Sequence, residues 1–63
     1  MKVSFDFDGV LTTRAGKEML VKKLAMGDDV FIITARTTGK STVLDFAKRY
    51  QIPVTRVIFT IVG

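Results

Sequence analysis

The amino-acid sequence predicts an α/β protein with one small parallel sheet, in the order strand, helix, strand, helix, strand. Three short segments, residues 2–7, 29–35 and 55–62, are rich in the β-branched and aromatic residues typical of strands. The two segments between them, residues 15–26 and 40–50, repeat apolar residues at helical spacing. This alternation predicts parallel strands, because a parallel pair needs a crossover long enough to hold a helix.

The first strand is expected in the stretch KVSFDF, where apolar and polar residues alternate as they do in a strand with one buried face. The Asp8-Gly9 pair that follows is typical of a turn, since glycine adopts a positive φ without steric cost. In the first helix Leu20 and Leu24 lie four residues apart, and Gly27 suits the position just after its end.

The second helix is expected to bury the face that carries Val43, Ala47 and Tyr50. Its N-cap is expected at Thr37 or Thr38, whose hydroxyl oxygens accept hydrogen bonds from backbone amides. The second and third strands are continuous apolar runs, which predicts burial on both of their faces.

Right-handed crossovers that advance in one direction give the strand order 3-2-1 and put both helices on one face of the sheet. The opposite face is then bare, and an apolar face of this kind is ordinarily an association site. We therefore expect a homo-oligomer, most simply a two-fold dimer, formed through the uncovered sheet face or through the edge of the first strand.

Composition limits the chain to a single small domain, residues 1–63, with marginal stability. Cysteine and histidine are both absent, which excludes disulfides and zinc sites built from those residues. The net charge of +4 comes from dispersed lysines and arginines, so we do not expect nucleic-acid binding. No segment resembles a signal peptide or a membrane span, so we expect a cytoplasmic protein.

Two aspartates, Asp6 and Asp8, follow one another at the expected carboxyl end of the first strand, where ligands bind in open α/β sheets. Two carboxylates this close repel each other unless a cation or a shared proton lies between them. Mg²⁺ suits such a pair, because it takes one or two carboxylates together with waters and substrate phosphates. Taken alone, the Asp-x-Asp-Gly stretch is more typical of a plain turn than of a site.

The ten residues VSFDFDGVLT (3–12) resemble the first motif of the haloacid dehalogenase superfamily, an apolar strand followed by Asp-x-Asp-Gly-(Val/Thr)-Leu-Thr. The stretch DVFIITAR (29–36) resembles the second motif, an apolar strand that ends in Thr or Ser. The resemblance extends from residue 1 to about residue 58 and is strongest to the small phosphatases with a minimal cap or none. It implies a Rossmann-like fold and a Mg²⁺-dependent phosphohydrolase.

The resemblance also implies roles for individual residues. Asp6 would be the nucleophile that forms an aspartyl-phosphate, and Asp8 the general acid/base. Asp6 and Asp8 would hold Mg²⁺, the latter through its backbone carbonyl. Thr34 would bind the transferring phosphoryl group. The full set of candidate phosphate-binding residues is Thr34, Ala35, Arg36, Gly9 and Lys40.

Two further motifs of the superfamily have no counterpart in these 63 residues. They are a lysine beyond the second motif and an acidic pair after a later strand, whereas here no lysine follows Lys48 and no acid follows Asp45. The sequence thus resembles a core truncated after its third strand, out of a sheet of order 3-2-1-4-5. We expect phosphatase activity to be weak or absent; the alternative is a non-catalytic minimal fold that self-associates.

The stretch TARTTGKST (34–42) offers a second phosphate-binding hypothesis. Gly39, Lys40 and Ser41 match the end of a P-loop, but Thr34 stands where the first glycine of that motif belongs. A complete P-loop is therefore not expected. Backbone amides at the start of the helix, with Arg36 and Lys40 nearby, would still favour an anion; the alternative is an ordinary loop and helix start.

Overall fold

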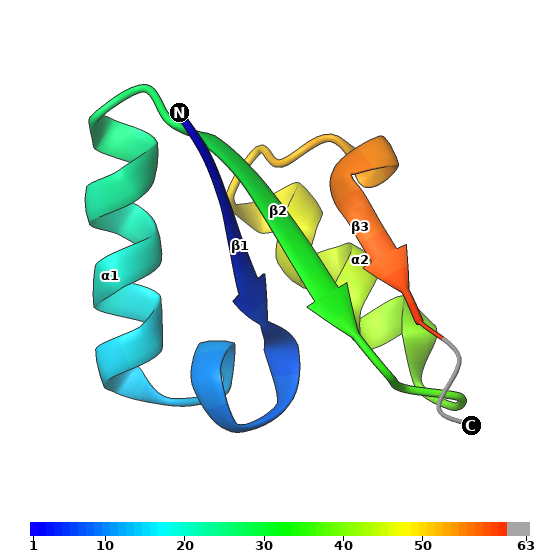
Figure 1. Ribbon diagram of the computed structural model, residues 1–63. Coiled ribbons are helices and arrows are strands. Elements are labelled where there is room, and N and C mark those ends of the chain that lie inside the picture. The colour runs from blue at the N-terminus through cyan, green and yellow to red at the C-terminus, as the bar shows by residue number, and fades with distance from the viewer. Residues whose placement is uncertain (61–63) are drawn as a thin grey trace.

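The computed structural model describes residues 1–60 of the chain as a three-stranded sheet with two main helices (Figure 1). Its elements in chain order are β1 (Lys2–Asp6), the tight turn η1 (Phe7–Leu11), α1 (Arg14–Ala25), β2 (Asp29–Thr34), α2 (Lys40–Arg49), the 3₁₀ turn η2 (Val54–Arg56) and β3 (Val57–Phe59). The predicted element order and the α/β class are confirmed. No helix in residues 1–60 has the length and apolar character needed to cross a membrane.

All three strands are parallel, with β2 in the middle and β1 and β3 at the edges. This is the predicted order 3-2-1 read from the other edge of the sheet. The register places Phe5 opposite Ile32 and Ile32 opposite Val57. Asp6 therefore ends an edge strand.

A single buried cluster lies between the helices and one face of the sheet. Leu20 of α1 and Val43 of α2 both belong to this cluster, together with Val30 and Ile32 of β2. Both helices therefore pack against the same face, because Val30 and Ile32 project from the same side of their strand. The remaining members of the cluster are Phe7, Leu11, Phe46, Ala47 and Ile52.

The prediction that β2 and β3 are buried on both faces is wrong for the face opposite the helices. Phe31 and Ile33 are half-buried, and Ile58 is 43% exposed. Nor is this face bare, because the Arg56 guanidinium lies 5.6 Å from the centre of the Phe31 ring and pairs with Asp29 at 3.2 Å. The uncovered apolar area is accordingly smaller than the sequence predicts.

The chain leaves β1 one residue earlier than expected and enters η1. Phe7, predicted as the last strand residue, instead turns into the core, where its ring meets Phe46 edge-on at 5.3 Å. Gly9 has the positive φ (83°) that the turn requires, and its amide donates to the Thr12 hydroxyl oxygen at 3.0 Å. Backbone hydrogen bonds from the Thr12 amide to the Phe7 carbonyl and from the Thr13 amide to the Val10 carbonyl close the turn, and the side chain of Leu11 is fully buried.

The starts of the two helices differ in their capping. Thr13 caps α1, since its hydroxyl oxygen accepts from the Gly16 amide at 3.1 Å. The N-cap of α2 is Gly39 in the left-handed region (φ 68°), without a side-chain cap, so the expectation of Thr37 or Thr38 is wrong. At the other end of the chain, β3 is shorter than the predicted 55–62, and residues 61–63 lie outside the described part.

Candidate functional site

The carboxyl ends of β1 and β2 bring three of the predicted site residues together. The η1 turn carries Asp8 back over the end of β2, where the Thr34 hydroxyl donates to a carboxylate oxygen of Asp8 at 3.5 Å. Thr34 itself is buried, and its hydroxyl oxygen accepts from the Arg36 amide at 3.3 Å. Asp8, Thr34 and Arg36 thus form one cluster above the strand ends.

Arg36 is the centre of this cluster. Its Nε lies 3.1 and 3.2 Å from the two carboxylate oxygens of Asp8, and its Nη2 lies 3.0 Å from one of them. The remaining nitrogen, Nη1, donates to the carbonyl of Gly39 at 3.2 Å. The guanidinium also lies 5.2 Å from the centre of the Phe7 ring, within the range of a cation–π contact. One side chain therefore ties the loop after β1 to the loop before α2.

The ion pair sets the protonation state of Asp8. Hydrogen bonding from Arg36 lowers the pKa of the Asp8 carboxyl below its ordinary value of 3.8, with smaller contributions from the Arg36 charge and the Thr34 hydroxyl. The same hydrogen bond raises the pKa of Arg36. Asp8 is therefore ionised at neutral pH and cannot act as a general acid while it is paired with Arg36.

Asp6 occupies a different environment from Asp8. It is the last residue of β1, is exposed, and lies opposite Ile33 on the face away from the helices. Within residues 1–60 no ion pair involves its carboxylate, and no group of three or more acidic side chains is placed to hold a metal. Asp6 is thus a free carboxylate at the strand end.

The other predicted phosphate-binding residues lie in the same two loops without joining the cluster. The Gly9 amide is already hydrogen-bonded to Thr12, and Ala35 is exposed between Thr34 and Arg36. The Lys40 ammonium lies 5.2 Å from the centre of the Phe59 ring. Of the two cations expected to meet a phosphate here, Arg36 is already neutralised by Asp8.

Sequence reasoning named Arg36 but missed its partners, Asp8 and the Gly39 carbonyl. One signal was available, because an acid just after β1 and a base just after β2 must meet at the same end of a parallel sheet. What the sequence could not supply was the path of η1, which decides whether Asp8 or Asp6 faces the guanidinium.

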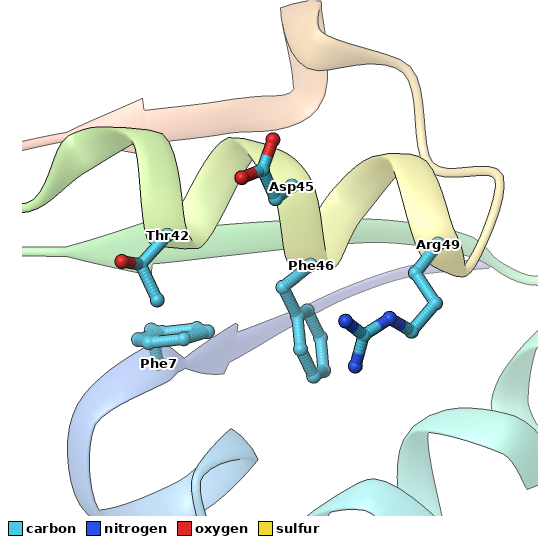
Figure 2. Close-up of a pocket in the computed structure, with 5 residues that line it drawn as sticks. All are labelled: Phe7, Thr42, Asp45, Phe46 and Arg49. Atoms are coloured by element: carbon cyan, nitrogen blue, oxygen red, sulfur yellow. The ribbon is translucent and has the colours of Figure 1, made fainter.

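A hollow of about 230 Å³ lies between α2 and Phe7, on the side of the sheet that the helices cover (Figure 2). Phe7 and Phe46 line it, and Figure 2 shows the Arg49 side chain beside the Phe46 ring. Thr42 and Asp45 complete the lining, whereas Asp8, Thr34 and Arg36 do not contribute. The hollow is below the 300–1,000 Å³ that is typical of ligand pockets, and it is not part of the strand-end site.

Comparisons with known proteins give no further assignment: no family model, no curated protein and no solved structure matches this chain.

The Asp8–Arg36 pair predicts a dependence of stability on pH. A carboxyl whose pKa is lower in the folded state stabilises the fold above its ordinary pKa, here 3.8, and this contribution is lost as the pH falls through the folded value. We expect the free energy of unfolding to decrease below about pH 4, and the difference between wild type and Asp8→Asn to disappear at the acid end. Urea denaturation at a series of pH values measures both effects.

Asp45→Asn is the control for this titration, because Asp45 is exposed and has no ion pair within residues 1–60. A pH dependence that is identical in wild type and Asp8→Asn would contradict the role of the pair.

Proposed function

We propose that this chain carries the phosphoryl-transfer half of a phosphohydrolase site of the haloacid dehalogenase type, with Asp6 as the nucleophile. The observation that supports this most is the cluster of Asp8, Thr34 and Arg36 at the carboxyl ends of two adjacent strands, the same end of the sheet at which Asp6 lies without an ion pair within residues 1–60. In the single chain the Asp6 carboxylate has no ion pair within residues 1–60 and could attack phosphorus, and the Thr34 hydroxyl and Arg36 guanidinium are donors suited to phosphoryl oxygens. The resemblance of residues 3–12 and 29–36 to that superfamily's motifs points to the same chemistry.

In the proposed reaction a carboxylate oxygen of Asp6 attacks the phosphorus of a phosphate ester. A P–O bond to Asp6 forms while the P–O bond to the leaving group breaks, and the leaving oxygen takes up a proton. Water then attacks the phosphorus of the aspartyl-phosphate, releases inorganic phosphate, gives up a proton and regenerates the Asp6 carboxylate. Asp8 is the proposed carrier of these protons.

The Asp8–Arg36 ion pair constrains how Asp8 can play that part. An Asp8 carboxylate held by two guanidinium nitrogens is a weak base and is not protonated at neutral pH. We propose that a substrate phosphate competes for Arg36, since a guanidinium binds phosphate and carboxylate oxygens with the same paired geometry. Withdrawal of Arg36 would return the pKa of Asp8 toward its ordinary value and free the carboxylate for proton transfer.

The donor set available for Mg²⁺ is small but of the right chemical kind. The Asp6 carboxylate and the Asp8 backbone carbonyl are hard oxygen ligands, and Mg²⁺ commonly uses only one or two protein carboxylates with waters and substrate oxygens. The Asp8 carboxylate is engaged by Arg36 and is therefore a poor second ligand. When bound, the ion would offset negative charge on the phosphoryl oxygens.

Turnover by the 63-residue chain is expected to be slow. The first two motifs would supply the nucleophile and the phosphate donors, but residues 1–60 provide neither a free lysine at the cluster nor a third acidic ligand near Asp6. Loss of electrostatic stabilisation of this kind typically costs about 10²–10³ in kcat for each donor.

The alternative is a non-catalytic fold that keeps the motif as structure and associates with itself. Two observations favour it: Asp8 and Arg36 already satisfy each other, and Ile58 leaves apolar surface on the open face.

Hydrolysis of p-nitrophenyl phosphate with and without Mg²⁺ separates these functions. We expect Mg²⁺-dependent release of nitrophenol by wild type, loss of that release in Asp6→Asn, and a partial loss in Asp8→Asn. Asp45→Asn is the matched control, because Asp45 is an exposed acid of α2 without an ion pair within residues 1–60. Activity that survives Asp6→Asn would rule out the nucleophile, and a folded wild type with no activity would favour the non-catalytic alternative.

A further inference from the structure

The outer edge of β1 is open in the described chain. β1 pairs only with β2, and Lys2, Ser4 and Asp6 are all exposed. Helix α1 packs against the helix-bearing face, since its buried side chain, Leu20, joins the cluster with Val30 and Ile32, and it lies on the β1 side of the sheet without pairing with the backbone of β1 (Figure 1). An unpaired edge of this kind is a ready template for another strand.

Backbone hydrogen bonding shows which groups face that edge. The Asp29 amide donates to the Met1 carbonyl at 2.8 Å, so Met1 turns its carbonyl toward β2. Backbone groups of successive strand residues point to opposite sides. Val3 and Phe5 therefore also face β2, while the amides and carbonyls of Lys2, Ser4 and Asp6 face outward.

We propose that two copies of this chain pair through β1, antiparallel, with each Ser4 opposite the partner's Ser4. In this register Lys2 lies opposite the partner's Asp6. Each outward-facing residue, Lys2, Ser4 and Asp6, then forms a hydrogen-bonded pair with the partner residue opposite it, and the two residues of a pair exchange two N–H···O bonds. A shift of two residues in either direction leaves an outward-facing residue of each strand without a partner. The two-fold axis passes between the two serines, as a closed dimer requires.

The side chains fit the same register on both faces of the sheet. On the open face, the ammonium of Lys2 meets the carboxylate of the partner's Asp6, and the symmetry creates this pair twice. On the helix-bearing face, Val3 lies opposite the partner's Phe5 at the closely spaced positions of the ladder. Val3 and Phe5 are only half-buried in the single chain, so pairing would cover more of both.

The edge is favoured over the open sheet face as the contact between copies. On the open face the Arg56 guanidinium already covers Phe31 and is held by Asp29. The edge, by contrast, offers unpaired backbone groups and a charge pattern that is complementary to itself.

The dimer would also place the partner's Lys2 beside Asp6, which has no ion pair within residues 1–60. Any part that this lysine plays toward a bound phosphate rests on the proposed function, whereas the dimer and its register do not. The test therefore measures mass rather than activity, so that failure of the dimer and failure of the phosphatase assignment are separate results.

Charge-reversal variants, measured by analytical ultracentrifugation, test the register. We expect wild type to dimerise at micromolar concentration, and Lys2→Asp and Asp6→Lys each to weaken the dimer about tenfold or more, because two attractive pairs become repulsive. The double variant Lys2→Asp/Asp6→Lys restores the pairs and should dimerise again. An equimolar mixture of the two single variants should form a heterodimer, since each strand of one then carries two acids and each strand of the other two lysines.

Ser4→Pro tests the backbone contribution, with Ser4→Ala as its control. The Ser4 amide faces away from β2, so proline at this edge position removes a donor needed only for pairing between copies. We expect Ser4→Pro to be a folded monomer by circular dichroism and ultracentrifugation, and Ser4→Ala to remain a dimer. A wild type that stays monomeric, or a dimer that is indifferent to both the charge reversals and Ser4→Pro, would overturn the proposal.

Discussion

Gly16→Ala is expected to remove a large part of the protein's stability. A Cβ atom at this position would lie 1.8 Å from the carbonyl oxygen of Val10, far closer than the van der Waals contact distance. The neighbour is backbone and cannot rotate away as a side chain would. Either η1 or the first turn of α1 must therefore move.

That movement would break a set of contacts that depend on one another. The Val10 carbonyl accepts from both the amide and the hydroxyl of Thr13, and the Thr13 hydroxyl oxygen in turn caps α1 through the Gly16 amide. Overpacking ordinarily costs about 1–3 kcal/mol, and loss of a cap about 1 kcal/mol. A 63-residue domain has roughly 3–9 kcal/mol of stability in total.

Thermal denaturation followed by circular dichroism measures this effect. Lys17→Ala is the matched control, because it lies next to Gly16 in α1 but is exposed, and alanine favours the helix. Gly16→Ala with a melting temperature within a few degrees of wild type would show that η1 can shift at little cost.

The close approach at Gly16 illustrates what the sequence could not reveal. The periodicity of Leu20 and Leu24 predicts a helix here, and Gly16 then looks like an unfavourable helical residue. Its purpose appears only when η1 is seen to pass within contact distance of α1. Neighbouring strands and helices were predictable because hydrophobic periodicity is local, whereas the path of η1 depends on packing between segments.

The candidate site shows the same division. The resemblance of residues 3–12 and 29–36 to known motifs implied that Asp8 and Thr34 share one site, and their convergence agrees with the rule that parallel strands end at one edge of a sheet. The pairing of Arg36 with Asp8, and not with a ligand or with Asp6, did not follow, because it depends on a turn of five residues whose φ and ψ no pattern specifies. The predicted N-cap of α2, Thr37 or Thr38, was wrong for a related reason. The N-cap is Gly39, which has a left-handed conformation and whose carbonyl accepts a hydrogen bond from Arg36.

Ile32→Ala is the second substitution expected to remove much of the stability. Ile32 is fully buried in the middle of the central strand, between Phe5 on one side and Val57 on the other. Truncation of a buried isoleucine to alanine costs about 2–5 kcal/mol through lost transfer free energy and the cavity that remains. In a domain of this size each kcal/mol lowers the melting temperature by roughly 4–8 °C, so we expect a decrease of about 10 °C or more.

Ile33→Ala is the matched control for Ile32→Ala. Ile33 follows Ile32 in the same strand and loses the same atoms, but it lies on the open face and is only half-buried. Both substitutions change strand propensity by the same amount. The difference between the unfolding free energies of the two variants therefore reports how deeply each face of the strand is buried. We expect Ile33→Ala to cost less than half as much as Ile32→Ala. Equal losses would mean that the open face is covered in solution, and would move the contact between copies from the β1 edge to the sheet face.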